Sequence, residues 1–221
     1  MESDIRAYNM TVQDMDMQNN GVPGWQTQTL EYYNTNTDSF IAGSMPADMS
    51  DARARFLAHV PDNGCILDLG CGSGRDTKIF LEKGYAVDAI DGSAELCRRA
   101  SEYAGVPVRQ MLFRDLDETE KYDGIWACAS LLHLPKAELK ETVLPKIAAA
   151  LKKNGVLYAS LKYGDFEGIR NGRLFSDYTE ETLAEVWQDM GSMPVFETWS
   201  TYDVRPDRAA ERWINLLARR V

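Results

Sequence analysis

The chain has 221 residues, of which 44% are hydrophobic, and these values suit one domain with a full apolar core. Its formal net charge is −10, which makes it a poor general binder of nucleic acid, because that affinity depends on neutralising phosphates. No apolar run reaches the ~20 residues of a membrane span, and the start shows no signal-peptide pattern. We therefore expect a cytoplasmic protein without a membrane partner.

The N-terminal region differs in composition from the rest of the chain. Residues 1–50 hold seven acidic residues against one base, Arg6, and nothing before about residue 25 shows a helical or strand period. The stretch TQTLEYYNTN is a candidate short helix. We expect residues 1–45 to form an arm or lid and residues 46–221 to form the main domain. Within that domain, SDARARFLAHV predicts a helix with Ser50 as its N-cap.

From residue 65, short apolar strands alternate with helical patterns, which predicts a parallel sheet with helices on both faces. The predicted strands cover residues 65–70, 85–90, 106–113, 122–130 and 155–163. The predicted helices cover residues 75–84, 93–105, 136–155 (bent at Pro145) and 179–191. Two more strand-like runs follow, PVFETWSTYDV and RWINLLARRV. About seven residues separate them, too few for a crossover helix, so we expect this last pair to be antiparallel.

The first strand leads into CILDLGCGSGRD, where Gly70, Gly72 and Gly74 stand at alternate positions. Such glycines let the backbone approach a ligand beyond the carboxyl ends of the strands. The stretch lacks the GxxxxGK[ST] pattern of a phosphate loop, and Arg75 takes the place of the third glycine of a dinucleotide fingerprint. A pyrophosphate site is therefore disfavoured, and a tight turn without a ligand stays an alternative.

Two acidic residues follow the next strands. Asp91 ends the second strand and can accept hydrogen bonds from both hydroxyls of a ribose, or it can be a turn former in DGS. Asp115, in FRDLD, can accept from an exocyclic amine, or it can be a solvated loop residue. Small residues in ACASLLHL border the same cleft. Together these features describe a ribose and an adenine with no phosphate between them.

The combination of LDLGCGSG, Asp91 and RDL resembles the class I methyltransferases that use S-adenosylmethionine. The resemblance runs from about residue 30 to the end, and it is greatest to the small tellurite-resistance and ubiquinone-biosynthesis type. It implies a doubly wound, three-layer α/β/α fold with a seven-stranded, mostly parallel sheet. The implied strand order is 3-2-1-4-5-7-6, with the last strand antiparallel.

The resemblance also implies S-adenosylmethionine as the cofactor. It assigns the methionyl part to the glycine loop and Asp68, the ribose to Asp91 and the adenine to Asp115 and the residue after it. Tyr33 resembles an N-terminal tyrosine that covers the cofactor, with a helix face packed on the core as the alternative. The implied cofactor-binding residues are Tyr33, Asp68, Gly70, Cys71, Gly72, Asp91, Gly92, Asp115, Leu116 and Ala129.

Methyl transfer from a sulfonium mainly requires alignment and exclusion of water, and it needs a base only when the acceptor arrives protonated. His133 follows the fourth strand on the ligand side and is the candidate catalytic base, with packing ahead of Pro135 as the alternative. The glycines and charges of residues 162–178 suit a mobile loop. Lys162, Arg170 and Arg173 in this loop could hold an anion, with solvated loop charges as the alternative.

We therefore expect methyl transfer to a small-molecule acceptor, with anions among the candidates. The alternatives are a methyltransferase acting on protein or RNA, a non-catalytic S-adenosylmethionine-binding protein, and a nucleotide-dependent oxidoreductase, which the missing third glycine disfavours. The four cysteines form no CxxC pair, so we expect neither a metal nor a disulfide.

Overall fold

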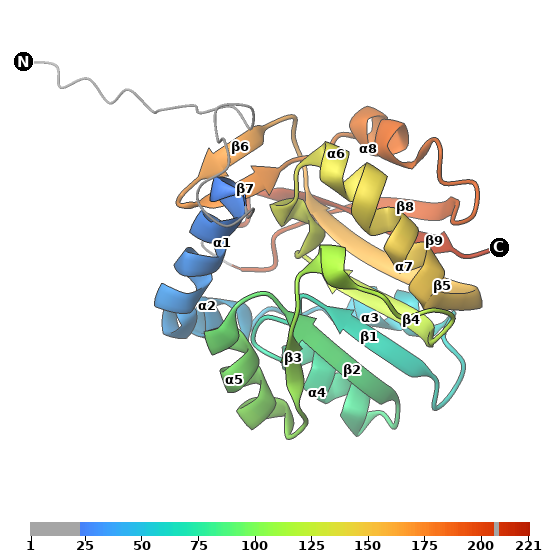
Figure 1. Cartoon of the computed structure of the whole chain (residues 1–221), viewed down its shortest axis with the longest axis horizontal. Coiled ribbons are helices and arrows are strands. Elements are labelled where there is room, and N and C mark those ends of the chain that lie inside the picture. The colour runs from blue at the N-terminus through green and yellow to red at the C-terminus, as the bar shows by residue number, and fades with distance from the viewer. Residues whose placement is uncertain (1–22, 206–207) are drawn as a thin grey trace, which may run out of the picture.

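The computed structural model describes residues 23–205 and 208–221, so residues 1–22 of the predicted arm lie outside the described residues. The strands are β1 (Cys65–Leu69), β2 (Ala86–Asp91), β3 (Val108–Gln110), β4 (Tyr122–Cys128), β5 (Leu151–Lys162), β6 (Glu167–Arg170), β7 (Arg173–Ser176), β8 (Val195–Tyr202) and β9 (Arg212–Arg219). Seven of them form one sheet in the order β3-β2-β1-β4-β5-β9-β8 (Figure 1). Strands β1 to β5 pair in parallel, whereas β9 is antiparallel to β5 and β8. The predicted strand order is confirmed, because β6 and β7 form a separate hairpin.

Helices cover both faces of the sheet. They are α1 (Gly24–Thr35), α2 (Thr37–Ser44), α3 (Ser50–Leu57), α4 (Arg75–Glu82), α5 (Ala94–Ala104), α6 (Lys136–Glu138), α7 (Leu144–Ala150) and α8 (Glu180–Trp187). On one face, Phe56 of α3 and Phe80 of α4 pack against Trp126 of β4, with ring centroids 5.3 and 5.5 Å away. On the other, Ile147 of α7 joins a buried cluster with Ile125 of β4. The three-layer architecture is confirmed. No helix in the described part of the chain is long and apolar enough to cross a membrane.

Two predicted elements need correction. Ser50 is the first residue of α3 rather than its cap, and its amide donates to Asp48 Oδ1 at 2.8 Å. The helix predicted over residues 136–155 ends at Ala150, and it contains a π-helical turn over Leu139–Val143, which ends two residues before Pro145. Strand β5 begins at once with Leu151, which is buried and pairs with β4. Burial in the sheet therefore overrides helix propensity here.

The segment predicted as a mobile loop, residues 162–178, contains the β6–β7 hairpin instead. Its register pairs Arg170 with Arg173 across the two-residue turn Asn171–Gly172. Both turn residues have positive φ, 52° and 77°, as a type I′ turn requires. Figure 1 shows the hairpin beside α1, and the Leu174 amide of β7 donates to a threonine hydroxyl of α1 at 3.0 Å. The asparagine–glycine pair was therefore the decisive signal in this segment.

Candidate functional site

A cavity of about 310 Å³ lies at the carboxyl edge of the sheet, where parallel strands of this fold class place their ligands. One wall comes from α1 and the segment 44–52, and the other from the loops after β1, β2 and β4. Nine residues predicted from the sequence line it: Tyr33, Asp68, Gly70, Cys71, Gly72, Asp91, Gly92, Ala129 and His133. Residues far apart in the chain are thus brought to one site.

The glycine loop is shaped by left-handed backbone at Gly70 and Gly72, whose φ angles are 79° and 55°. A Cβ at Gly70 would lie 2.5 Å from the Cβ of Ser130, and one at Gly72 would lie 3.1 Å from the ring of Phe40. The loop is anchored to the sheet because the amides of Gly70 and Cys71 donate to a β2 carbonyl at 2.9 and 3.0 Å. A side chain at Gly70 would therefore clash, and one at Gly72 would require the Phe40 ring to shift, so the backbone itself forms the cavity wall.

Asp91 is held by two backbone amides at the end of β2. Its Oδ2 accepts from the Gly72 amide and its Oδ1 from the Ser93 amide, both at 2.9 Å. Burial raises the pKa of this carboxyl, while the two amides oppose that rise. Since a carboxylate oxygen has two acceptor sites, each oxygen keeps one for a ligand. The side chain is therefore oriented in advance toward the cavity.

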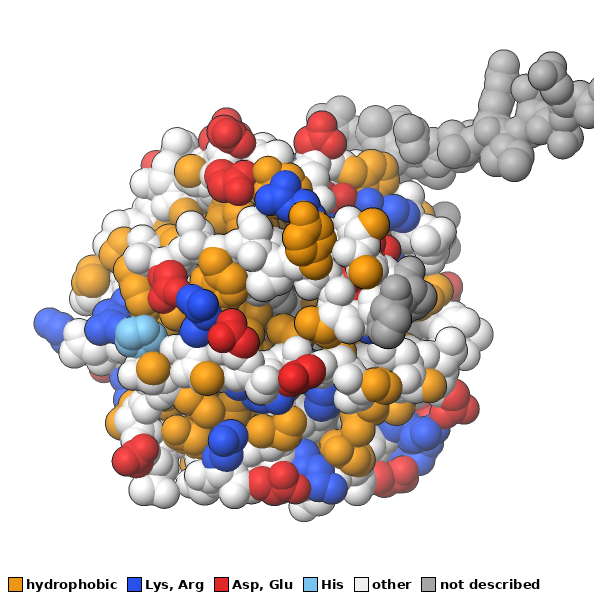
Figure 2. Space-filling model, turned by 180° about the vertical axis from the view of Figure 1, so that it is seen from behind, with side chains coloured by type: hydrophobic (Ala, Val, Ile, Leu, Met, Phe, Trp, Pro, Cys, Tyr) orange, Lys and Arg blue, Asp and Glu red, His pale blue; other side chains and the backbone are white. Residues whose placement is uncertain are grey.

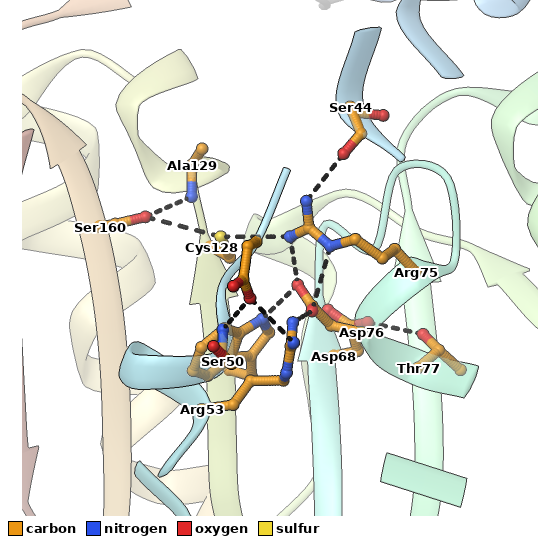
Figure 3. Close-up of polar contacts among 12 residues, drawn as sticks. Ser44, Ser50, Arg53, Asp68, Arg75, Asp76, Thr77, Cys128, Ala129 and Ser160 are labelled. Atoms are coloured by element: carbon orange, nitrogen blue, oxygen red, sulfur yellow. Dashed lines mark hydrogen bonds and ion pairs between the residues drawn. The ribbon is translucent and has the colours of Figure 1, made fainter. Parts of the chain in front are cut away.

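Asp68 lies deeper, at the end of β1. The residue is 2% exposed, and its Oδ2 accepts from the hydroxyl of Thr77 at 2.6 Å (Figure 3). Burial, together with the nearby carboxylate of Asp76, raises the pKa of Asp68 to about 7. The cavity thus holds a carboxyl group that changes charge near neutral pH.

Two arginines surround Asp76 beside Asp68, as Figure 3 shows. Arg53 Nη1 and Arg75 Nη2 each lie 2.6 Å from its carboxylate, and the indole of Trp126 donates to it at 3.1 Å. The exposed carboxylate of Asp48 lies 3.9 Å from Arg53. The two guanidinium groups and the carboxylate of Asp76 therefore form one cluster of ion pairs beside Asp68, at this end of the cavity.

Tyr33 and His133 form a hydrogen-bonded pair. The Nδ1 of His133 lies 2.6 Å from the Leu174 carbonyl, so this nitrogen carries the proton and donates. Its Nε2 therefore accepts, and the hydroxyl of Tyr33 donates to it at 2.7 Å. Arg173 Nη1 donates to the same hydroxyl at 3.3 Å. Burial lowers the pKa of His133 to about 4 and raises the pKa of Tyr33, so both side chains are neutral at pH 7.

Four predicted site residues do not line the cavity: Asp115, Leu116, Arg170 and Arg173. Asp115 is exposed in a 3₁₀ turn, and Leu116 is in the core with 1% exposure. Arg170 makes two 2.8 Å hydrogen bonds to Asp177. The guanidinium of Arg173 stacks on Tyr32, 4.2 Å from the ring centroid. Their roles in binding stay predictions. The segment after β3 instead lines the cavity with Met111, Leu112, Phe113 and Arg114.

Sequence reasoning missed the residues that line the far half of the cavity, from β5, β8 and β9. Tyr202 and Val204 belong to this half and are 65% and 51% exposed, so the cavity reaches the surface there. Figure 2 shows a hollow bordered by hydrophobic side chains on the face turned away from the viewer in Figure 1. The alternation of residues in the final two predicted strands indicates which residues of one strand share a face, but it does not tell which face borders the cavity.

Known proteins resemble the chain in sequence and in fold. A family model described as a methyltransferase domain matches residues 66–155. A trans-aconitate 2-methyltransferase of Azoarcus sp. (strain BH72) is 34% identical over 119 residues, which cover 50% of this chain and 45% of that protein. YqeM of Bacillus subtilis (strain 168), named as a methyltransferase, is 29% identical over 143 residues, 59% of this chain and 56% of that protein. The chain thus spans about half the length of these curated relatives.

A solved structure extends the similarity over most of the chain. It is Burkholderia thailandensis 1,6-didemethyltoxoflavin-N1-methyltransferase with bound 1,6-didemethyltoxoflavin and S-adenosylhomocysteine. It is 26% identical, with a TM-score of 0.68, and the match covers 86% of this chain and 84% of that one. Residues 66–155 thus match a methyltransferase domain, and the confirmed strand order, the glycine loop and this solved structure give the chain the fold of the class I S-adenosylmethionine-dependent methyltransferases, with S-adenosylmethionine as the cofactor.

Proposed function

We propose that this chain transfers the methyl group of S-adenosylmethionine to a small-molecule acceptor. The observation that carries the proposal is the fixed carboxylate of Asp91 beside the glycine loop, in one cavity with the Tyr33–His133 pair. When bound, S-adenosylmethionine supplies a methyl group on a sulfonium that is already an activated leaving group. The relatives named for trans-aconitate and 1,6-didemethyltoxoflavin support a small molecule rather than a protein or RNA.

The residues present fit this cofactor. Asp91 offers two acceptor sites for ribose hydroxyls, and Asp68 offers a carboxylate for the methionyl ammonium group. The bare backbone of the glycine loop lets the methionyl part approach closely.

We also propose that His133 acts through Tyr33 when the acceptor must lose a proton. Because the Nε2 lone pair of His133 faces the Tyr33 hydroxyl, the histidine can take a proton from that hydroxyl. Tyr33 is then the group that receives the proton of the acceptor. Arg173, which also donates to this hydroxyl, opposes its protonation and stabilises negative charge on it. His133 is a positioning and relay residue in this scheme.

Binding and transfer can be tested separately. Calorimetry should show that the purified chain binds S-adenosylmethionine and S-adenosylhomocysteine but not NAD. Incubation with methyl-labelled cofactor and cell extract, followed by fractionation, should place the label among small molecules. Label in protein or RNA would contradict the proposed acceptor class. Cofactor binding without transfer to any fraction would indicate the non-catalytic alternative.

Asp91→Ala should weaken S-adenosylhomocysteine binding by about 1.5–3 kcal/mol, the usual contribution of hydrogen bonds to a charged group. Asp88→Ala is the matched control, because Asp88 lies on the same strand, outside the cavity, and pairs with Lys121 at 2.6 Å. Calorimetry on both variants measures the difference. Equal losses would mean that the ribose is held elsewhere.

The raised pKa of Asp68, about 7, predicts a pH dependence of cofactor affinity. An ammonium group favours the ionised carboxyl, so binding should release a proton and the affinity should rise by about tenfold from pH 6 to pH 8. The stability of the cofactor-free protein should show the opposite pH dependence. Because folding raises the pKa of Asp68, the contribution of this carboxyl to the free energy of unfolding falls as the pH rises from about 4 to 7. Calorimetry in two buffers with different ionisation enthalpies measures the released proton, and Asp68→Asn should abolish the release. A release that persists in Asp68→Asn would assign it to another group.

A further inference from the structure

The far half of the cavity has a continuous floor formed by the carboxyl end of β5 and by the β8–β9 hairpin. Directly paired residues of neighbouring strands point their side chains to the same face of a sheet. The register pairs Asn215 with both Ser160 and Trp199, and it pairs Trp213 with Thr201. All these side chains line the cavity. We call Ser160, Trp199, Thr201, Trp213 and Asn215 the hairpin floor.

Most polar atoms of the hairpin floor are used within the protein. The amide oxygen of Asn215 accepts from the hydroxyl of Tyr158 at 2.8 Å, and its nitrogen donates to the hydroxyl of Thr201 at 3.1 Å. The indole nitrogen of Trp213 donates to Asp203 at 3.1 Å. These groups fix the shape of the floor and leave aromatic surface toward the cavity.

The two remaining hydrogen-bond donors of the floor do not face a ligand. The indole nitrogen of Trp199 is buried without exposed surface, and it has no partner among the described residues. The hydroxyl of Ser160 accepts from the Ala129 amide at 2.8 Å and donates to the sulfur of Cys128 at 3.8 Å. The floor therefore offers a ligand ring surfaces rather than hydrogen-bond donors.

The charged side chains in this half of the cavity are paired. Asp203 accepts from Arg205 Nε at 2.8 Å, and Asp76 lies 2.6 Å from Arg75 Nη2. The cations that were expected to hold an anionic acceptor, Lys162, Arg170 and Arg173, do not line the cavity. An anion on the hairpin floor would thus meet ion pairs that are already formed, so it has no counter-charge of its own.

The indoles themselves also disfavour an anion. Arg55 lies over the ring of Trp199 at 4.9 Å, and Lys162 lies over the ring of Trp213 at 5.2 Å. Both cations also pair with carboxylates, Arg55 at 3.0 Å and Lys162 with Glu211. The remaining indole surface carries the negative face of the ring quadrupole, which attracts the edges and offset faces of other rings.

We propose that the hairpin floor is the acceptor site and that the acceptor is an uncharged, planar aromatic or heteroaromatic ring. The indoles of Trp199 and Trp213 contact the ring. This inference rests on the proposed function, because it identifies the substrate class of the same cavity. It replaces the anionic acceptor that the sequence suggested.

The test uses the full chain saturated with S-adenosylhomocysteine and two probes of similar shape, 2-quinolone and quinoline-2-carboxylate, which differ in charge. Calorimetry should show binding of 2-quinolone at least about tenfold tighter than binding of the carboxylate. Trp199→Leu and Trp213→Leu each remove one ring of the floor. Each should weaken 2-quinolone binding by about tenfold. Trp187→Leu is the matched control, because Trp187 is also a buried indole, 7% exposed, but lies in α8 outside the cavity.

S-adenosylhomocysteine binding is measured in every variant and should stay unchanged, which also shows that each variant is folded. Tighter binding of the carboxylate, no binding of 2-quinolone, or equal losses in the Trp187 and Trp199 variants would overturn the acceptor assignment. The proposed function would survive those results. It would fail instead if the unmodified chain bound neither S-adenosylmethionine nor S-adenosylhomocysteine.

Discussion

Gly70→Ala is expected to destabilise the protein by about 2–5 kcal/mol. A left-handed backbone costs a residue with a Cβ about 1–2 kcal/mol, and overpacking adds about 1–3 kcal/mol. Gly70 meets both conditions, since its φ is 79° and its Cβ would lie 2.5 Å from the Cβ of Ser130. Urea unfolding of the purified variant measures the change in the free energy of unfolding. Cofactor binding should be lost as well, because the loop must move to relieve the contact.

Gly105→Ala separates the two contributions. Gly105 ends α5 with nearly the same φ, 77°, but nothing lies within 4 Å of the position of its Cβ. Its replacement should therefore cost only the backbone part, about 1–2 kcal/mol, and leave cofactor affinity unchanged. Equal destabilisation by the two substitutions would show that the glycine loop yields without cost and that its close packing does not shape the site.

Tyr33→Phe is expected to lower kcat by about 10²–10⁴-fold for an acceptor that must lose a proton, because it removes the group that carries the proton to His133. His133→Ala should lower it by a similar factor, and combining both substitutions should add little, since the two side chains act as one unit. The dissociation constant of S-adenosylhomocysteine should barely change. Tyr32→Phe is the control, because Tyr32 is adjacent in sequence but does not line the cavity.

The pH profile gives a second readout for this pair. With the pKa of His133 lowered to about 4, its Nε2 lone pair is available throughout the neutral range. The rate of the unmodified chain should therefore show no titration near pH 6.5 that belongs to His133. A titration of His133 would be one that is present in the unmodified chain and absent in His133→Ala. Such a titration would mean that the imidazole is exposed to solvent during the reaction and acts directly. Full additivity of the two substitutions would likewise contradict a relay.

The sequence predicted the cofactor half of the cavity well for a physical reason. Asp68, the glycine loop and Asp91 each follow a parallel strand, and the carboxyl ends of parallel strands converge at one edge. The β6–β7 hairpin was missed because Asn171 and Gly172 were interpreted as features of a loop, although together they specify a tight turn. That error also led to the assignment of Arg170 and Arg173 to the acceptor, whereas the hairpin commits Arg170 to Asp177.

The hairpin floor was beyond reach for a different reason. Whether Trp199, Trp213 and Asn215 share a face depends on the register of β9 with two neighbouring strands, and a shift of one residue would reverse every side chain. The N-terminal boundary at residue 45 stays a prediction. Within the predicted arm, Trp25 is 5% exposed and joins the main core cluster, so a truncation that tests the arm should stop before it.

The attachment of α1 to the β6–β7 hairpin bears on how the chain folds as it is synthesised. The hydrogen bond from the Leu174 amide to Thr29 joins residues 145 positions apart, and the Tyr33–His133 contact joins residues 100 apart. Chains emerge from the ribosome amino end first, so α1 leaves long before the strands that hold it. The face of α1 that is buried in the folded protein has no packing partner until about two thirds of the chain has been synthesised. Contacts between residues so far apart in sequence also form slowly. The cavity is therefore among the last parts of the molecule to assemble, after the central parallel strands that support it.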